Sequence, residues 1–184
     1  MEFSPIGRAA LRAREGERLT AYLDSQKVPT IGVGITTASG LIKVVLGMTI
    51  TAAQSDALFA KAAEQYAAPI RKALTREIPQ ELFDALVSLA YNCGAERIAA
   101  STAVKRANFG DYKGAATAIM LWNKPAAIMS RRRAERDQAL TPYSTALPKA
   151  RDTDAKRIKA PAAPAAAKPG FWAQVHSALS RKAA

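Results

Sequence analysis

Two carboxylic acids near the start of the chain, Glu15 and Asp24, stand in unlike local settings. Glu15 precedes Gly16 at the end of a charged helical segment, where a carboxylate faces the negative end of the helix dipole and its protonated form is favoured. Asp24 opens a turn over residues 24–27, so we expect it to hydrogen-bond the backbone and to stay ionised. One carboxyl that keeps a proton and one that remains an anion are the groups that glycosidic bond cleavage uses. Thr30, on the returning strand, offers a hydroxyl to the water that Asp24 would hold.

The spacing of these three residues is more informative than their types. Eight residues separate Glu15 from Asp24, five separate Asp24 from Thr30, and Ile-Gly-Val-Gly follows at 31–34. This pattern resembles the phage lysozyme or endolysin family, glycoside hydrolase family 24. FDALVSLAYNCG at 83–94 and RRRAER at 131–136 fall in the family's order, so the resemblance spans roughly residues 6–140.

The resemblance implies an enzyme that hydrolyses the β-1,4 bond between N-acetylmuramic acid and N-acetylglucosamine of bacterial peptidoglycan. It implies Glu15 as general acid, Asp24 as the residue that positions water or stabilises charge, and Thr30 as its helper. Inversion at the anomeric carbon is also implied, and neither a metal nor an organic cofactor is expected. The family often has an aromatic residue and a histidine where this chain has Val33 and Ile35, which puts polar support of the cleft by a histidine in question.

Two other classes of function remain open from the residues alone. A lytic transglycosylase would use one carboxyl and form a 1,6-anhydro product, although Asp24 and Thr30 argue against it. A non-catalytic protein that binds cell wall or nucleic acid would use only the basic charge of the chain. Carboxylates in most sequences are solvated surface charges, so the flanking match carries the catalytic interpretation.

The predicted fold is α+β and lysozyme-like, with two lobes, mostly helical, with a small β-hairpin or sheet lobe and a basic C-terminal tail. Ser4 as N-cap and Pro5 at the first helical position predict a helix that ends at Glu15. A hairpin should follow, with a third strand near residues 42–45. Its glycines, Gly32 and Gly34, leave room for a backbone or a sugar to approach closely.

Two longer helices are predicted after the hairpin. A capping box of Thr51 and Gln54 opens a helix over residues 52–67 that is ended or kinked by Pro69. This helix resembles the one that joins the two lobes in the family. Residues 79–92 carry apolar side chains at helical spacing and predict the central buried helix. The arginines of the first helix, Arg8, Arg12 and Arg14, and the cluster 131–133 are most simply solvated faces, with contact to wall anions as the alternative for the cluster. Trp122 is expected to pack in the core rather than to stack on a sugar.

The chain of 184 residues has 27 basic and 15 acidic residues, a net charge of +12. This charge favours a polyanionic partner, namely cell wall, lipopolysaccharide or nucleic acid, among which composition does not choose; given the resemblance, peptidoglycan is the expected partner and nucleic acid is not. No signal peptide or membrane-spanning run is visible, which predicts a protein that waits in the host cytoplasm until it is released to the periplasm. We also expect the protein to be a monomer. The lone Cys93 is interpreted as a small buried thiol rather than a nucleophile.

Composition divides the chain into three parts. Residues 1–148 form the predicted catalytic domain, 149–170 a charged and Pro/Ala-rich linker, and 171–184 a short basic amphipathic helix. The apolar face of that helix is expected either to lie on an anionic outer membrane or lipopolysaccharide, or to dock on the catalytic domain.

Overall fold

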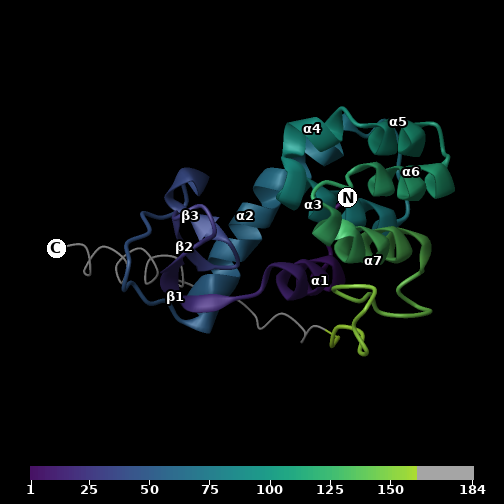
Figure 1. Cartoon of the computed structure of the whole chain (residues 1–184). Coiled ribbons are helices and arrows are strands. Elements are labelled where there is room, and N and C mark those ends of the chain that lie inside the picture. Colours follow the sequence, from purple (N-terminus) through teal and green to yellow (C-terminus); the bar gives the residue numbers. More distant parts are fainter. Residues whose placement is uncertain (161–184) are drawn as a thin grey trace.

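The computed structural model describes residues 1–160, and the chain folds into two lobes joined by a long helix (Figure 1). The small lobe holds a three-stranded antiparallel sheet in the order β1-β2-β3, and the large lobe holds most of the helices. The mostly helical two-lobed fold is as predicted. The Pro/Ala tract after residue 160 and the helix predicted at 171–184 lie outside the described residues.

Helix α1 (Pro5–Glu15) begins and ends where the sequence predicts. The Ser4 hydroxyl accepts a hydrogen bond from the Gly7 N–H at 2.9 Å, and Pro5 needs no donor at the first position. Gly16 has φ 76° and ψ 171°, a conformation that side chains with a Cβ rarely adopt. The glycine therefore ends the helix directly after Glu15 and sends the chain into the small lobe.

The small lobe is a tight meander of β1 (Arg18–Leu23), β2 (Pro29–Gly32) and β3 (Ile35–Thr36), followed by the short 3-10 helix η1 (Thr37–Ser39). The third strand predicted at residues 42–45 is wrong. Gly32 and Gly34 both have positive φ, so the chain reverses at Val33 and Ile35–Thr36 pairs back on β2 at once. Residues 48–50 cover the free edge of β1 instead, through the bonds Ala21 N–H to Met48 O at 2.8 Å and Ile50 N–H to Leu19 O at 2.9 Å.

Helix α2 (Ala52–Ala73) joins the lobes because two of its faces are buried in different cores. Leu58 and Ala62 pack with the sheet, whereas Phe59, Ala63 and other residues pack in the large lobe. The predicted capping box is present, with Thr51 and Gln54 bonded to each other's backbone N–H at 3.1 and 2.8 Å. The helix continues through Pro69 to Ala73, so the proline does not end it.

Helix α3 (Gln80–Cys93) is the buried centre of the large lobe, as predicted. Its inward residues Leu82, Phe83, Leu86 and Leu89 are fully buried. The helices around it are α4 (Ala95–Ala99), α5 (Thr102–Asn108), α6 (Tyr112–Ala118), η2 (Ile119–Leu121), η3 (Ala126–Ile128) and α7 (Met129–Leu140). Helices α1 and α7 both pack on α3, and this contact brings the ends of α1 and α7 together.

Residues 141–160, which we call the C-terminal strap, follow α7 without a helix or strand and lie beside α7 and α1 (Figure 1). Tyr143 anchors the beginning of the strap: its N–H donates to Glu81 at 2.7 Å and its hydroxyl to Asp84 at 2.8 Å. Between residues 1 and 160 no helix has the length and apolar character needed to cross a membrane.

Candidate functional site

Glu15 ends α1 with its side chain 21% exposed, and its carboxylate faces α7. Arg131 Nη2 lies 2.7 Å from Glu15 Oε1, which makes an ion pair between the two helices. Arg131 itself is buried at 3% exposure. Glu15 is therefore placed where α1 leaves the large lobe, with a cation fixed against one of its oxygens.

Arg131 and Arg132 of α7 are buried, so the prediction of a solvated face is wrong for these two residues, whereas Arg133 stays partly exposed and pairs with Asp152. Arg131 Nε donates to Glu135 at 2.9 Å and Arg132 Nη1 to the other oxygen of Glu135 at 2.5 Å, while Ser88 Oγ donates at 2.7 Å. Burial lowers the pKa of Arg131, but Glu135 and Glu15 outweigh burial and raise it above its ordinary value. Burial acts to raise the pKa of Glu135, yet Arg131 and the neighbouring arginines lower it. A buried charge cluster thus supports the cation that faces Glu15.

Arg14 is also buried rather than solvated, which corrects its prediction. Its guanidinium donates to Ser88 Oγ at 3.0 Å and to the Lys149 carbonyl at 3.2 Å. Burial lowers the pKa of Arg14 to about 10, and the positive charge of Arg131 acts in the same direction. The sequence could not show this because the partners come from α3 and from the strap.

Asp24 organises the first turn of the small lobe, as predicted. Its Oδ1 accepts the N–H groups of Gln26 at 2.8 Å and Val28 at 2.9 Å. Thr30 is buried, and its hydroxyl donates to the Val28 carbonyl at 3.0 Å rather than to Asp24. Val28 therefore links the two residues, and among residues 1–160 no side chain or backbone group makes a hydrogen bond or ion pair with Oδ2 of Asp24.

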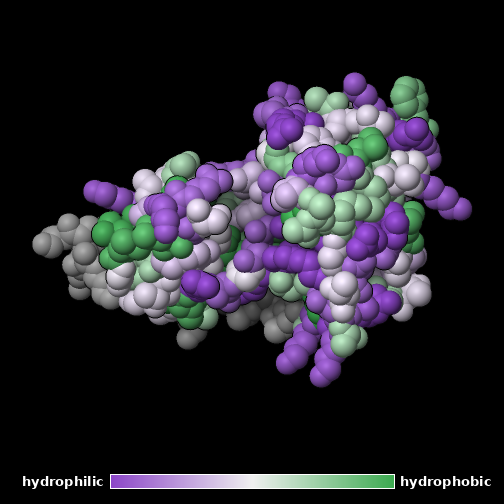
Figure 2. All heavy atoms as spheres, viewed as in Figure 1, coloured by the Kyte–Doolittle hydropathy of each residue, from purple (hydrophilic) through white to green (hydrophobic). Residues whose placement is uncertain are grey.

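A cavity of about 410 Å³ lies between the lobes. Gly34 and other residues of β3 and η1 line its small-lobe side, and Tyr66 and Tyr91 line its large-lobe side with their ring centroids 4.6 Å apart. The Tyr91 hydroxyl donates to the Val33 carbonyl at 2.7 Å and so ties the lobes together at the cavity. Burial raises the pKa of Tyr91, and the charge of Glu15 raises it further. Figure 2 shows the waist between the lobes, with hydrophilic residues along it.

Val33 and Ile35, the two departures from the family pattern, are both buried in apolar clusters. Ile35 packs with Leu58 and Ala62, so apolar contact replaces any polar support at this position. The chain keeps the turn of the family motif and fills its inner positions with core residues.

A second cavity, of about 750 Å³, lies in the large lobe beyond the last turn of α3. Trp122 packs partly against the core, as predicted, but it also lines this cavity, and Arg97 stacks over its ring at 4.9 Å. Cys93 lines the cavity as well and is half-buried rather than buried as predicted. Its partial burial raises the pKa of its thiol. Asn92 and Cys93 line this cavity and Tyr91 lines the one between the lobes, so the end of α3 separates the two.

Comparison with known proteins agrees with this arrangement. Residues 12–136 match the family model described as phage lysozyme. The chain belongs to the phage lysozyme family. The endolysin of Salmonella phage P22 is 39% identical over 140 residues, which cover 74% of this chain and 96% of the relative. A solved structure of a P22 lysozyme mutant gives a TM-score of 0.70 at 37% identity over 77% of this chain and 99% of that chain. An endolysin from Escherichia coli O157:H7 phage FAHEc1 gives 0.70 at 36% identity, over 76% and 94%.

As a member of the phage lysozyme family, the chain is a peptidoglycan-degrading enzyme with the lysozyme-like fold predicted from its sequence. The matched span contains Glu15, Asp24 and Thr30, whose individual roles stay predictions. Within residues 1–160, no group of three or more His, Cys, Asp or Glu side chains is placed to hold a metal ion.

Sequence reasoning missed the contacts of three residues in this phage lysozyme domain. Arg131 and Glu135 stand at i and i+4, a spacing that signals an ion pair but not its burial. Tyr91 fits the apolar stripe of α3, so nothing in the sequence marks its hydroxyl as a contact between the lobes.

Proposed function

We propose that this enzyme hydrolyses the β-1,4 bond between N-acetylmuramic acid and N-acetylglucosamine, with Glu15 as general acid, Asp24 holding the attacking water and Thr30 supporting the turn. The observation that carries the proposal is the position of Glu15, which faces a buried arginine at the point where the chain passes from the large lobe to the small lobe. The cavity between the lobes is the candidate binding site, although Glu15, Asp24 and Thr30 are not among its lining residues. A sugar chain in that cavity would meet Tyr66 and Tyr91 on one side and the glycine turn on the other.

Arg131 does not depend on Glu15 alone for a counter-ion. Arg131 has two carboxylate partners, Glu15 and the buried Glu135. When Glu15 is protonated, Arg131 still has Glu135 at 2.9 Å, so no buried cation is left without a counter-ion. Glu15 can then protonate the leaving oxygen, and the returning carboxylate meets the same guanidinium.

Asp24 has the features of the second carboxylate. One of its oxygens is used by the turn, which fixes the orientation of the carboxylate and leaves the other oxygen for water. In an inverting hydrolase such a carboxylate activates water on the face of the sugar opposite the acid. We therefore propose inversion, which proton NMR of the first products reports as the α-anomer from a β-linked substrate.

Product analysis of Glu15→Gln beside the wild type on defined peptidoglycan tests the assignment. Glutamine keeps the shape of the side chain and removes the acid, so the release of new reducing ends should fall by a factor of at least about 100. Clearance of purified peptidoglycan at an undiminished rate would refute the role of Glu15. Mass spectrometry separates the alternatives, since a lytic transglycosylase forms 1,6-anhydro ends and a non-catalytic wall-binding protein forms no new ends.

We also propose that the enzyme causes host cell lysis as a monomer that reaches the wall from the cytoplasm. For residues 171–184 we keep the hypothesis of contact with an anionic outer membrane or lipopolysaccharide, which rests on the sequence pattern alone. Deletion of residues 170–184 should spare activity on purified wall and reduce killing of intact Gram-negative cells. Equal killing by the truncated chain would remove this idea.

A further inference from the structure

The C-terminal strap lies outside the family match, which ends at residue 136, yet it reaches the residue next to Glu15. Arg151 Nη2 donates to the Arg14 carbonyl at 2.9 Å. In the opposite direction, the Arg14 guanidinium donates to the Lys149 carbonyl at 3.2 Å. The strap therefore holds both the backbone and the side chain of Arg14, and Glu15 follows directly in the chain.

The end of α1 needs such a donor. The last four carbonyls of a helix have no partner within the helix. Gly16 N–H satisfies the Arg12 carbonyl at 2.9 Å, and Arg151 satisfies that of Arg14. A guanidinium at this end also complements the negative end of the helix dipole. The last turn of α1, which carries Glu15, is thus closed from outside the helix.

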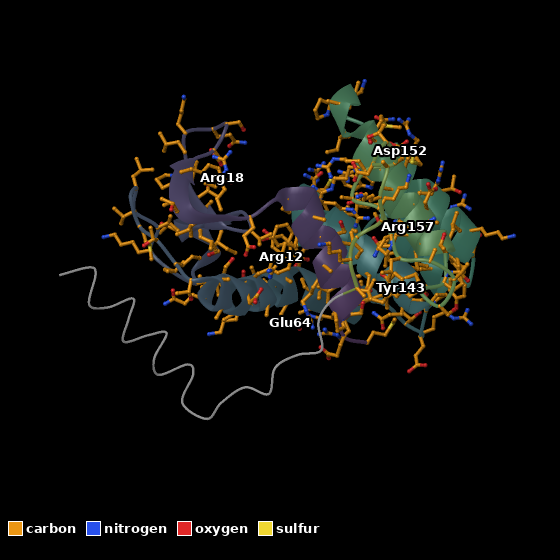
Figure 3. All side chains as sticks on the ribbon, turned by 90° about the horizontal axis from the view of Figure 1, so that it is seen from below. Arg12, Arg18, Glu64, Tyr143, Asp152 and Arg157 are labelled. Carbon is orange, nitrogen blue, oxygen red and sulfur yellow. The ribbon has the colours of Figure 1, made fainter. Side chains whose placement is uncertain are left out.

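The strap is itself attached to the helix that carries the partner of Glu15. Asp152 accepts from Ser130 Oγ and from Arg133 Nε, and its N–H donates to the Ser130 carbonyl at 3.2 Å. Both residues are on α7, one directly before Arg131, the arginine paired with Glu15, and the other two positions after it. Figure 3 shows Asp152 on the large-lobe side of α1, across from Arg18 on the small lobe. The strap, α7 and the end of α1 form a closed set of contacts around the carboxylate.

From this set we infer that Arg151 is a positioning residue for Glu15. It fixes the main chain at the end of α1, so that the Glu15 carboxylate keeps its place relative to Arg131 and to the bond that it protonates. The inference rests on the proposed role of Glu15. It assigns to the strap a part in catalysis, because a displacement of about 1 Å at a catalytic group can cost about 100-fold in rate.

Kinetics of full-length variants on soluble peptidoglycan fragments test the inference. Arg151→Ala should lower kcat about tenfold or more and leave KM within about twofold, since the groups that line the cavity are unchanged. Arg151→Lys keeps a donor and a charge and should restore most of kcat. Arg157→Ala is the matched control, because this exposed arginine donates to the Leu147 carbonyl within the strap and not to α1. Rates are taken well below each thermal midpoint, and Arg151→Gln replaces the alanine variant if that variant does not fold.

Glu15→Gln measured in the same assay separates the two proposals. If Glu15→Gln retains activity, the acid assignment fails. If Glu15→Gln is inactive while Arg151→Ala keeps the kcat of the wild type, only the positioning role fails. A loss of thermal stability in Arg151→Ala with unchanged kcat for the folded enzyme would likewise show a purely structural strap and overturn the inference.

Discussion

Replacement of Glu135 by glutamine tests how the buried charges beside the active site are held. Glu135 is 0% exposed and receives hydrogen bonds from Arg131, Arg132 and Ser88. Glutamine keeps the shape but removes the charge, and its amide N–H₂ would point at a donor. Arg131 would then keep only its ion pair with Glu15, and Arg132 would lose its carboxylate partner.

The expected loss of stability follows from the free-energy cost of leaving a buried ion without its partner. Breaking a buried pair on one side costs about 3–5 kcal/mol. For a domain of this size each kcal/mol lowers the thermal midpoint by about 2–4 °C, so the midpoint of Glu135→Gln should fall by roughly 6–20 °C.

The loss of stability in Glu135→Gln should depend on pH, and the neighbouring arginines determine the direction of this dependence. Burial acts to raise the pKa of Glu135, but Arg131, Arg14 and Arg132 together lower it below its ordinary value. A carboxylate whose pKa is lowered on folding adds stability that is complete above its unfolded pKa, about 4.3, and is lost as pH falls through the folded pKa. The difference in stability between wild type and Glu135→Gln should therefore be full at pH 6–7 and should narrow at lower pH.

Urea unfolding of both proteins between about pH 3 and pH 7 measures this difference, with linear extrapolation to water. Asp137→Asn is the matched control, because Asp137 lies on the same helix and pairs with Arg136 at an exposed position. Its effect should stay below about 1 kcal/mol. A Glu135→Gln variant as stable as this control at pH 7, or a difference that grows on acidification, would refute the reasoning.

Three further substitutions test other contacts. Tyr91→Phe removes the bond to Val33 across the lobes and should lower the free energy of unfolding by about 0.5–1.5 kcal/mol in urea titrations; no change would show that this bond adds nothing. Gly7→Ala would place a Cβ 2.5 Å from the Asp84 carboxyl carbon, so its thermal midpoint should fall by the equivalent of about 1–3 kcal/mol; an unshifted midpoint would contradict close packing of α1 on α3. Tyr66→Ala should raise KM for peptidoglycan fragments up to about tenfold with kcat nearly constant, and a loss in kcat alone would argue against a sugar-binding wall.

The parts of the fold that local chemistry controls could be predicted from the sequence. Ser4, Pro5 and Gly16 fix α1 through rules that act over a few residues, and Asp24 forms its turn in the same way. The third strand could not be placed, because its position depends on a reversal at Val33 that brings Ile35–Thr36 back onto β2. Residues 42–45 have a strand-like composition, but the edge of β1 is already covered by residues 48–50.

The arginines of α7 and Arg14 show why the site could not be predicted in full from the sequence. A run of three arginines on a helix reads as a solvated face unless a partner from elsewhere in the chain is known. Here Glu135 is near in sequence, but Ser88 on α3 and Glu15 on α1 complete the cluster. Likewise, the partners of Arg14 come from α3 and from residue 149, which composition assigns to a linker.

The two carboxylate partners of Arg131, Glu15 and Glu135, should differ in how much each contributes to stability and to activity. Glu135 is fully buried, whereas the Glu15 side chain remains 21% exposed and its loss leaves Arg131 paired with Glu135. Glu15→Gln should therefore lower stability less than Glu135→Gln does, while it lowers activity far more. Equal losses of stability in the two variants would show that Glu15, too, is part of the structural charge pair.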